Sequence, residues 1–187
     1  MILQQRRLFK GKIVESLGMT EAAQQDDPLF DIWHETGVRV RYAETDRMGV
    51  VYHANYLVWF EIGRTEFCRA RGFAYRDMEE NEDAFLVVAE SYCRYKAPAY
   101  YDEDLLVRTH ITEMRRRSVR FGYEIVRAST GQIIAEGETG HVVTDGEGRV
   151  RTMPEKYRAL LSHVPEEDIH TSQLPARAGR VPDGSAP

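Results

Sequence analysis

Apolar residues recur along the middle of the chain with two different periods, and each period predicts one kind of element. Between residues 55 and 71 they recur at three- and four-residue steps, which describes one face of a helix that ends near Gly72. Other positions of this segment are also apolar, so we expect the helix to be covered on more than one side. Residues 37–45 alternate between apolar and basic side chains, which is typical of a strand with one solvated face.

Four further segments are rich in β-forming residues and are separated by turn and charged segments. They span residues 84–95, 104–114, 118–128 and 132–144. Glycine-containing segments at 129–132 and 144–148 fit tight turns, the charged segment 76–83 is read as a linker, and 153–161 predicts a closing helix. The order predicts an α+β architecture: strand, long helix, a meander of four strands and a short helix, with a five-stranded antiparallel sheet wrapped around the one long central helix.

Composition and charge set the class of protein. The chain has 187 residues, 42% of them apolar, and a net charge of -5. We expect one domain over residues 36–163, a partly disordered N-terminal extension over 1–35, and a disordered tail over 164–187, where apolar residues are scarce. The negative charge argues against nucleic acid as a partner. No apolar run approaches the ~18 residues of a membrane span and no signal peptide is evident, so a cytoplasmic location is expected.

Candidate chemistry is concentrated in the stretch "YAETDRMGVVYHANY", residues 42–56. An acidic, turn-prone piece leads through Gly49 and His53 into the helix, whose first backbone N–H groups have no internal partners. A thioester carbonyl needs positive dipoles near its oxygen and a nucleophile or base near its carbon. Asp46, just before the helix, suits the second role: it attacks directly and gives an anhydride, or it deprotonates a water molecule. The residues leave both routes open.

The candidate residues also have purely structural interpretations. Asp46 is also a residue type that binds its own backbone in a turn, and His53 either orients the reactants or is satisfied by a nearby carbonyl. Tyr42 either hydrogen-bonds the loop or packs in a strand. Asn55 is a competent helix cap. Glu61 is an alternative catalytic carboxylate, or a solvated helix charge.

The stretch "YAETDRMGVVYHANYLVWFEIGRTEF" resembles the signature of hotdog-fold acyl-CoA thioesterases of the 4-hydroxybenzoyl-CoA thioesterase type, and more closely the bacterial branch often associated with the Tol-Pal system. The later "YKAPAYYDEDLLVRT" is similar to that branch as well, and the resemblance covers residues 38–161. It implies that the catalytic aspartate is Asp46, with Tyr42 four residues before it and His53 seven residues after it. It implies that the His53 backbone N–H polarises the thioester, with Gly49 and Val50 in the substrate site.

One residue departs from this family pattern. Met48 stands where smaller residues are frequent, so we expect an altered pocket mouth. The family also binds CoA at a subunit interface, which implies a homodimer or homotetramer. Apolar residues on both faces of two predicted strands favour subunit association independently.

Basic residues are the candidates for binding the CoA phosphates, because guanidinium groups pair well with phosphate oxygens. Arg116 and Arg117 lie in the run "EMRRRSVR", and Lys96 is a further candidate, with a solvated hairpin tip as the alternative for the arginines. The histidines lack metal-ligand spacing, so no metal is expected. No redox cofactor is expected either, and CoA arrives as part of the substrate.

The sequence therefore predicts an acyl-CoA thioesterase that releases a free carboxylic acid and CoA. Two alternatives remain open. The first is a hotdog enzyme that acts on acyl-carrier-protein thioesters. The second is a non-catalytic acyl-CoA-binding domain, against which the presence of Asp46 argues.

Overall fold

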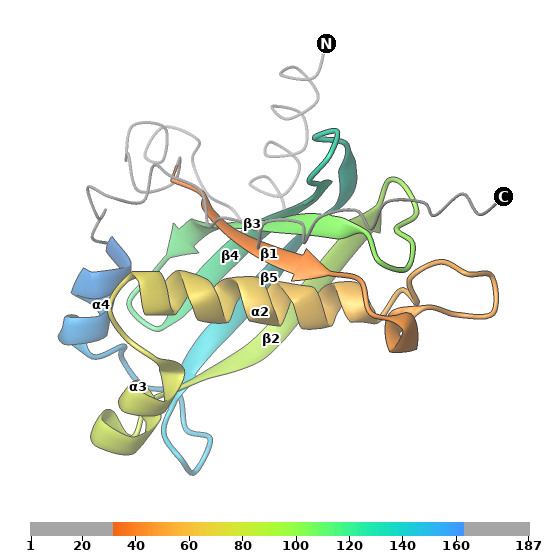
Figure 1. Cartoon of the computed structure of the whole chain (residues 1–187). Helices are drawn as coiled ribbons and strands as arrows, with labels where there is room; N and C mark the ends of the chain where they lie inside the picture. Colours follow the sequence, from red (N-terminus) through yellow and green to blue (C-terminus); the bar gives the residue numbers. More distant parts are fainter. Residues whose placement is uncertain (1–31, 163–187) are drawn as a thin grey trace, which may run out of the picture.

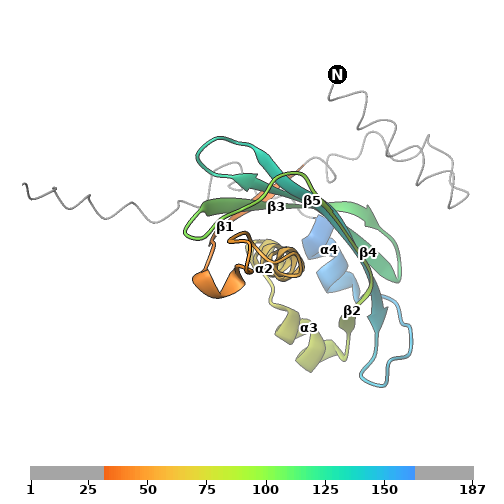
Figure 2. The same cartoon turned by 90° about the vertical axis from the view of Figure 1, so that its right-hand side faces the viewer.

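Five antiparallel strands form one sheet that curves around a central helix (Figures 1 and 2). The computed structural model describes residues 32–162. The strands are β1 (His34–Arg39), β2 (Phe85–Tyr95), β3 (Asp104–Met114), β4 (Ser118–Arg127) and β5 (Ile133–Thr144). The helices are η3, a 3-10 turn (Tyr42–Glu44), α2 (Asn55–Ala70), α3 (Tyr75–Glu82) and α4 (Glu155–Ser162). This architecture confirms the predicted fold class.

Residues 1–31 and 163–187 lie outside the described residues, and with them most of the predicted extension and tail. The domain limits at 36 and 163 stay predictions. Within residues 32–162, no helix has both the length and the apolar character that crossing a membrane requires.

The strand order is β1-β3-β4-β5-β2, so the predicted meander of four strands is wrong in one respect. β2 precedes β3 in the chain but pairs with β5 at the opposite side of the sheet. Residues 96–103 make the crossing, and on the way Ala99 accepts a hydrogen bond from Val51 while Glu103 accepts one from Val40. The connection therefore lies against the segment that precedes α2.

The core lies between α2 and the concave face of the sheet. α2 buries one face there, as its spacing predicts: Tyr56, Trp59, Phe60, Gly63, Phe67 and Cys68. Phe60 stacks on Tyr123 of β4 with ring centroids 4.3 Å apart. A full burial contributes about 1.5–3 kcal/mol for each large apolar side chain, so this face orients the helix firmly. Within residues 32–162, the opposite side of α2 is not covered, and Leu57 and Val58 are exposed there.

Two predicted segments require correction. The first strand ends at Arg39 and does not reach residue 45, because the Glu44 side chain accepts hydrogen bonds from the backbone and guanidinium of Arg41 and closes a turn. The predicted linker 76–83 is largely helix α3. Its single buried residue, Met78, anchors it, and Asp83 ends it in a left-handed conformation.

Candidate active site

The residues before α2 form a narrow turn that carries Asp46. Thr45 pairs with Val51 in an isolated bridge, and the Asp46 N–H donates to the carbonyl of Val50 at 2.8 Å. The Gly49 N–H donates to the Asp46 carbonyl at 2.9 Å. Gly49 has a φ of +77°, a left-handed conformation that glycine adopts without strain. The turn thus depends on the glycine that the sequence singled out.

One carboxylate oxygen of Asp46 accepts a hydrogen bond within the turn, and the other has no donor among residues 32–162. Its Oδ1 accepts the Met48 N–H at 2.7 Å. Its Oδ2 has no partner among residues 32–162, and the side chain is half-buried. The turn interpretation and the chemical one therefore coexist. Met48 itself is 84% exposed, so its predicted effect on the pocket mouth stays a prediction.

The start of α2 presents an unpaired backbone donor. Asn55 donates its N–H to Tyr52, whereas the His53 N–H has no acceptor in the described part of the chain. The His53 carbonyl accepts the Tyr95 hydroxyl at 3.1 Å. Partial burial, together with the neighbouring Cys93, raises the pKa of Tyr95 to about 12, so this hydroxyl keeps its proton at neutral pH. The tie to β2 holds the peptide group that directly follows the one with the free N–H.

Asn55 is the first residue of α2 and not its cap. The N-cap position is Ala54, which offers no side-chain acceptor. The Asn55 amide instead donates to the Glu44 carbonyl at 2.8 Å, and the Tyr52 N–H donates to the same oxygen at 2.9 Å. The predicted capping role is therefore wrong, and the residue joins the Asp46 turn to the helix.

The remaining residues of the predicted catalytic group are at the surface. Tyr42 is 77% exposed; its ring meets Tyr101 edge to face at 5.7 Å, and its side chain makes no hydrogen bond within residues 32–162. The His53 side chain is exposed and lies against the Tyr52 ring at 4.3 Å. Glu61, the alternative carboxylate, is exposed on α2. The backbone of Tyr42 still contacts the turn, because its carbonyl accepts the N–H and the hydroxyl of Thr45 at 3.2 and 2.8 Å.

The three basic candidates for binding the CoA phosphates lie at two different ends of the sheet. Lys96 follows β2 directly, at the end of the strand whose Tyr95 contacts His53, and it pairs with Glu136 at 3.0 Å. Arg116 and Arg117 lie in the hairpin between β3 and β4, where their carbonyls accept N–H groups of residues 153 and 143. That hairpin is at the end of the sheet where α2 finishes, opposite to the Asp46 turn (Figure 1). Within one chain, these arginines do not line the candidate site.

Sequence reasoning missed two residues that shape the site. Glu44 has only 4% of its surface exposed, and the buried Trp59 donates its indole N–H to it at 3.2 Å. Burial opposes ionisation of Glu44, but the hydrogen bonds from Arg41 and Trp59 outweigh it and hold the pKa of Glu44 below its ordinary value. The spacing of Arg41 and Glu44 by three residues was the only local signal.

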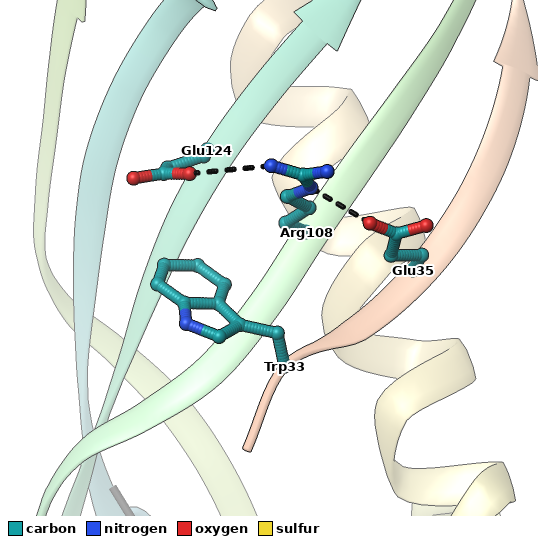
Figure 3. A pocket seen from close by; sticks show the side chains of 4 residues that line it. All are labelled: Trp33, Glu35, Arg108 and Glu124. Atoms are coloured by element: carbon teal, nitrogen blue, oxygen red, sulfur yellow. Dashed lines mark hydrogen bonds and ion pairs between the residues drawn. The ribbon is translucent and has the colours of Figure 1, made fainter. Parts of the chain in front are cut away.

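A hollow on the outer face of the sheet does not fit catalysis. It measures about 300 Å³ and is lined by Trp33, Glu35, Arg108 and Glu124, with α2 on the other side of the sheet (Figure 3). Arg108 bonds Glu35 at 2.7 Å and faces Glu124 at 3.9 Å, so its charge is already balanced. Among the described residues, no group of three His, Cys, Asp or Glu side chains could hold a metal ion.

Comparisons with known proteins find chains and solved structures that are similar to this one. The model of the family described as "Thioesterase-like superfamily" matches residues 40–166. YneP of Bacillus subtilis (strain 168) is 40% identical over 110 residues, which cover 59% of this chain and 78% of that protein. The acyl-CoA thioester hydrolase YbgC of Escherichia coli O6:H1 is 40% identical over 108 residues, 58% of this chain and 79% of that protein. The crystal structure of a DHNA-CoA thioesterase from Staphylococcus aureus, 30% identical, superposes with a TM-score of 0.67 and covers 70% of this chain and 89% of that one.

Proposed function

We propose that this chain, which belongs to the thioesterase-like superfamily and has its hotdog fold, hydrolyses the thioester bond of an acyl-CoA to a free carboxylic acid and CoA. The names of relatives that are 40% identical support the reaction and the substrate class. The closer assignment to the Tol-Pal-associated branch stays a prediction.

One observation carries the proposal: the Asp46 turn is tied directly to the start of α2. The bonds from Tyr52 and Asn55 to the Glu44 carbonyl hold the turn next to the unpaired His53 N–H. A carboxylate oxygen and a backbone N–H, both without a partner among residues 32–162, thus come from neighbouring parts of one loop. This is the pair of groups that thioester hydrolysis requires.

The chemistry has two forms, which share the same residues. As a general base, Asp46 takes a proton from water while the water oxygen bonds the carbonyl carbon; the carbon–sulfur bond then breaks, and the proton passes to the departing thiolate. As a nucleophile, the Asp46 oxygen bonds the carbonyl carbon and expels the thiolate, and water then cleaves the resulting anhydride. In both, the His53 N–H donates to the carbonyl oxygen as it gains negative charge. One such donor contributes about 2.7–4 kcal/mol to lowering the barrier in other acyl-transfer enzymes.

The other candidate residues keep the roles that the family resemblance implies. Gly49 and Val50 line the substrate site, Lys96 lies at the same end of the sheet, and His53 and Tyr42 complete the catalytic group through their side chains. Water is the only co-substrate, so the reaction needs no metal or redox cofactor. We place the enzyme in the cytoplasm, where CoA thioesters are available.

We further propose a homodimer or homotetramer with active sites at the subunit interface. β2 is at the edge of the sheet and carries exposed apolar side chains, Val87, Val88, Tyr92 and Tyr95. An exposed apolar edge strand is a site for pairing with another chain. A second subunit would also bring further basic residues to each site, and Arg116 and Arg117 are candidates for the CoA phosphates on that basis.

Thiol release from a panel of acyl-CoAs, with wild type and Asp46→Asn, tests the function. We expect wild type to release thiol from at least one member and Asp46→Asn to lower kcat by about 10²–10⁴-fold, because a positioned base contributes that much. Asp83→Asn serves as a matched control, since Asp83 is an exposed aspartate in a left-handed conformation that asparagine tolerates.

Three outcomes would contradict the proposal or part of it. Asp46→Asn turning over every good substrate at the wild-type rate would exclude Asp46 as the catalytic carboxylate. Thiol release only from acyl-carrier-protein thioesters would show that these, and not acyl-CoAs, are the substrates. Tight binding of intact acyl-CoA with no turnover would indicate a binding domain.

A further inference from the structure

Glu44 is a buried acid whose contacts connect the segment before the Asp46 turn with α2. It is the last residue of η3, two residues before Asp46, and 4% of its surface is exposed. An ionised group is costly to bury unless donors surround it. Its burial therefore calls for a reason beyond a solvated turn.

The carboxylate of Glu44 has donors on both oxygens. Oε2 accepts the Arg41 N–H at 2.7 Å. Oε1 accepts the Arg41 guanidinium at 2.8 Å and the Trp59 indole N–H at 3.2 Å. Trp59 is one turn inside α2 and is fully buried. The side chain thus joins the segment before the turn to the body of the helix.

The main chain of Glu44 makes the complementary connection. Its carbonyl accepts the Tyr52 N–H at 2.9 Å and the Asn55 amide at 2.8 Å. Glu44 is therefore at the base of the turn, with Asp46 on one arm and residues 52–55 on the other. The side chain and the carbonyl of Glu44 thus connect the segment that carries Asp46 with the start of α2.

We propose that Glu44 is a positioning residue for the thioester hydrolysis proposed above: its carboxylate, held by Arg41 and Trp59, sets the placement of Asp46 against the start of α2. The inference rests on that proposed function. Reaction rates depend steeply on such placement, and an error of about 1 Å costs roughly 10²-fold.

The test compares Glu44→Gln with Glu44→Asp, using a good acyl-CoA substrate of the wild-type enzyme. Glutamine keeps the length but loses the charge and turns one acceptor into a donor, so we expect kcat to fall about 10–100-fold. Aspartate keeps the charge at a shorter reach, so we expect an intermediate kcat. The control is Glu80→Gln, which removes an exposed charge on α3 and should leave kcat within about twofold of wild type.

Measuring substrate binding distinguishes a positioning role of Glu44 from general damage to the fold. In the Asp46→Asn background, where turnover is blocked, calorimetry measures the Kd for the intact acyl-CoA with and without Glu44→Gln. We expect the two Kd values to agree within about threefold, because the substrate site remains formed. A loss of affinity that matches the loss of kcat would show that Glu44 only maintains the fold, and it would overturn the proposal.

Two further results would also overturn it. One is a folded Glu44→Gln protein with wild-type kcat. The other is failure of both Glu44→Gln and Glu44→Asp to fold, which would make Glu44 a folding determinant. If the wild-type enzyme releases no thiol from any acyl-CoA, the proposed function fails instead, and that result is distinct from all of these.

Discussion

At the residue scale, polar side chains inside the core form a connected row behind α2. Tyr123 of β4 and Thr139 of β5 share a hydrogen bond of 2.7 Å, and Thr139 bonds the Nε2 atom of His141 at 2.9 Å. His141 is 1% exposed, and burial, aided by the charge of Arg64, lowers the pKa of its imidazole from 6.5 to about 4. The histidine is therefore neutral in the folded protein at neutral pH.

This buried histidine predicts a loss of stability in acid. Because the folded pKa of about 4 lies below the ordinary 6.5, the unfolded chain takes up the proton first. The stability that neutral His141 contributes is fully present above pH 6.5. It is lost as the pH falls from 6.5 toward 4, and the loss is on the order of 3 kcal/mol. Urea unfolding of wild type and His141→Gln at pH 8, 6 and 5 measures it. We expect the variant to lose less stability than wild type between pH 8 and pH 5; equal losses would contradict the assignment.

At the element scale, the close approach of α2 to the sheet depends on residues without side chains. Gly137 of β5 lies under the Phe60 ring, and a Cβ atom there would be 2.4 Å from Phe60 and 2.5 Å from the Tyr92 carbonyl. The Tyr92 contact involves backbone, which cannot rotate away. Gly140, on the same strand, would meet only the guanidinium end of Arg120, at 3.4 Å or more.

The two glycines give a matched pair of substitutions. We expect Gly137→Ala to destabilise the protein by about 1–3 kcal/mol, because the added methyl group overpacks the contact with α2. Gly140→Ala should stay within about 0.5 kcal/mol of wild type. Thermal and urea unfolding of both variants measures the difference. If Gly137→Ala were as mild as Gly140→Ala, both Phe60 and the Tyr92 carbonyl would have to move aside without cost.

The first and last residues of a helix or strand were predictable where they depend on residues close in sequence. The predicted strand at 104–114 matches β3 residue for residue, and the long helix differs from α2 only at its last position. Helix α3 was missed because its buried surface comes from one residue, Met78, which gives no period. Its other support is distant in sequence: the Tyr157 hydroxyl donates to the Asp77 carbonyl at 2.9 Å.

At the scale of the whole molecule, residues 32–162 leave apolar side chains exposed at two places, which is the basis of the proposed assembly. Exposed apolar side chains occur on the edge strand β2 and on the uncovered side of α2, where Leu57 and Val58 lie. Among the described strands, only β5 pairs with β2. The proposed second copy would pair along β2 and cover the side chains exposed on that strand.

Introducing a charge on this edge tests the proposed assembly. We expect wild type to sediment as a dimer or tetramer and Val88→Lys to shift toward single chains, because burying a lysine against apolar neighbours is costly. Thiol release should fall with dissociation if the sites are at the interface. Val150→Lys is the control, since Val150 is equally exposed but lies outside β2 and α2. A wild-type protein that remains monomeric at all concentrations would refute the assembly.

The sequence alone determined the helix, most strand limits, the glycine turn before α2 and the family motif around Asp46, because periodicity and turn chemistry act between near neighbours in the chain. Only the tertiary structure decided that β2 pairs with β5, that Glu44 is buried against Trp59, and that Arg116 and Arg117 lie at the far end of the sheet. These features depend on contacts between segments distant in sequence. No local pattern specifies them, since strand order and burial follow from how the whole sheet packs on α2.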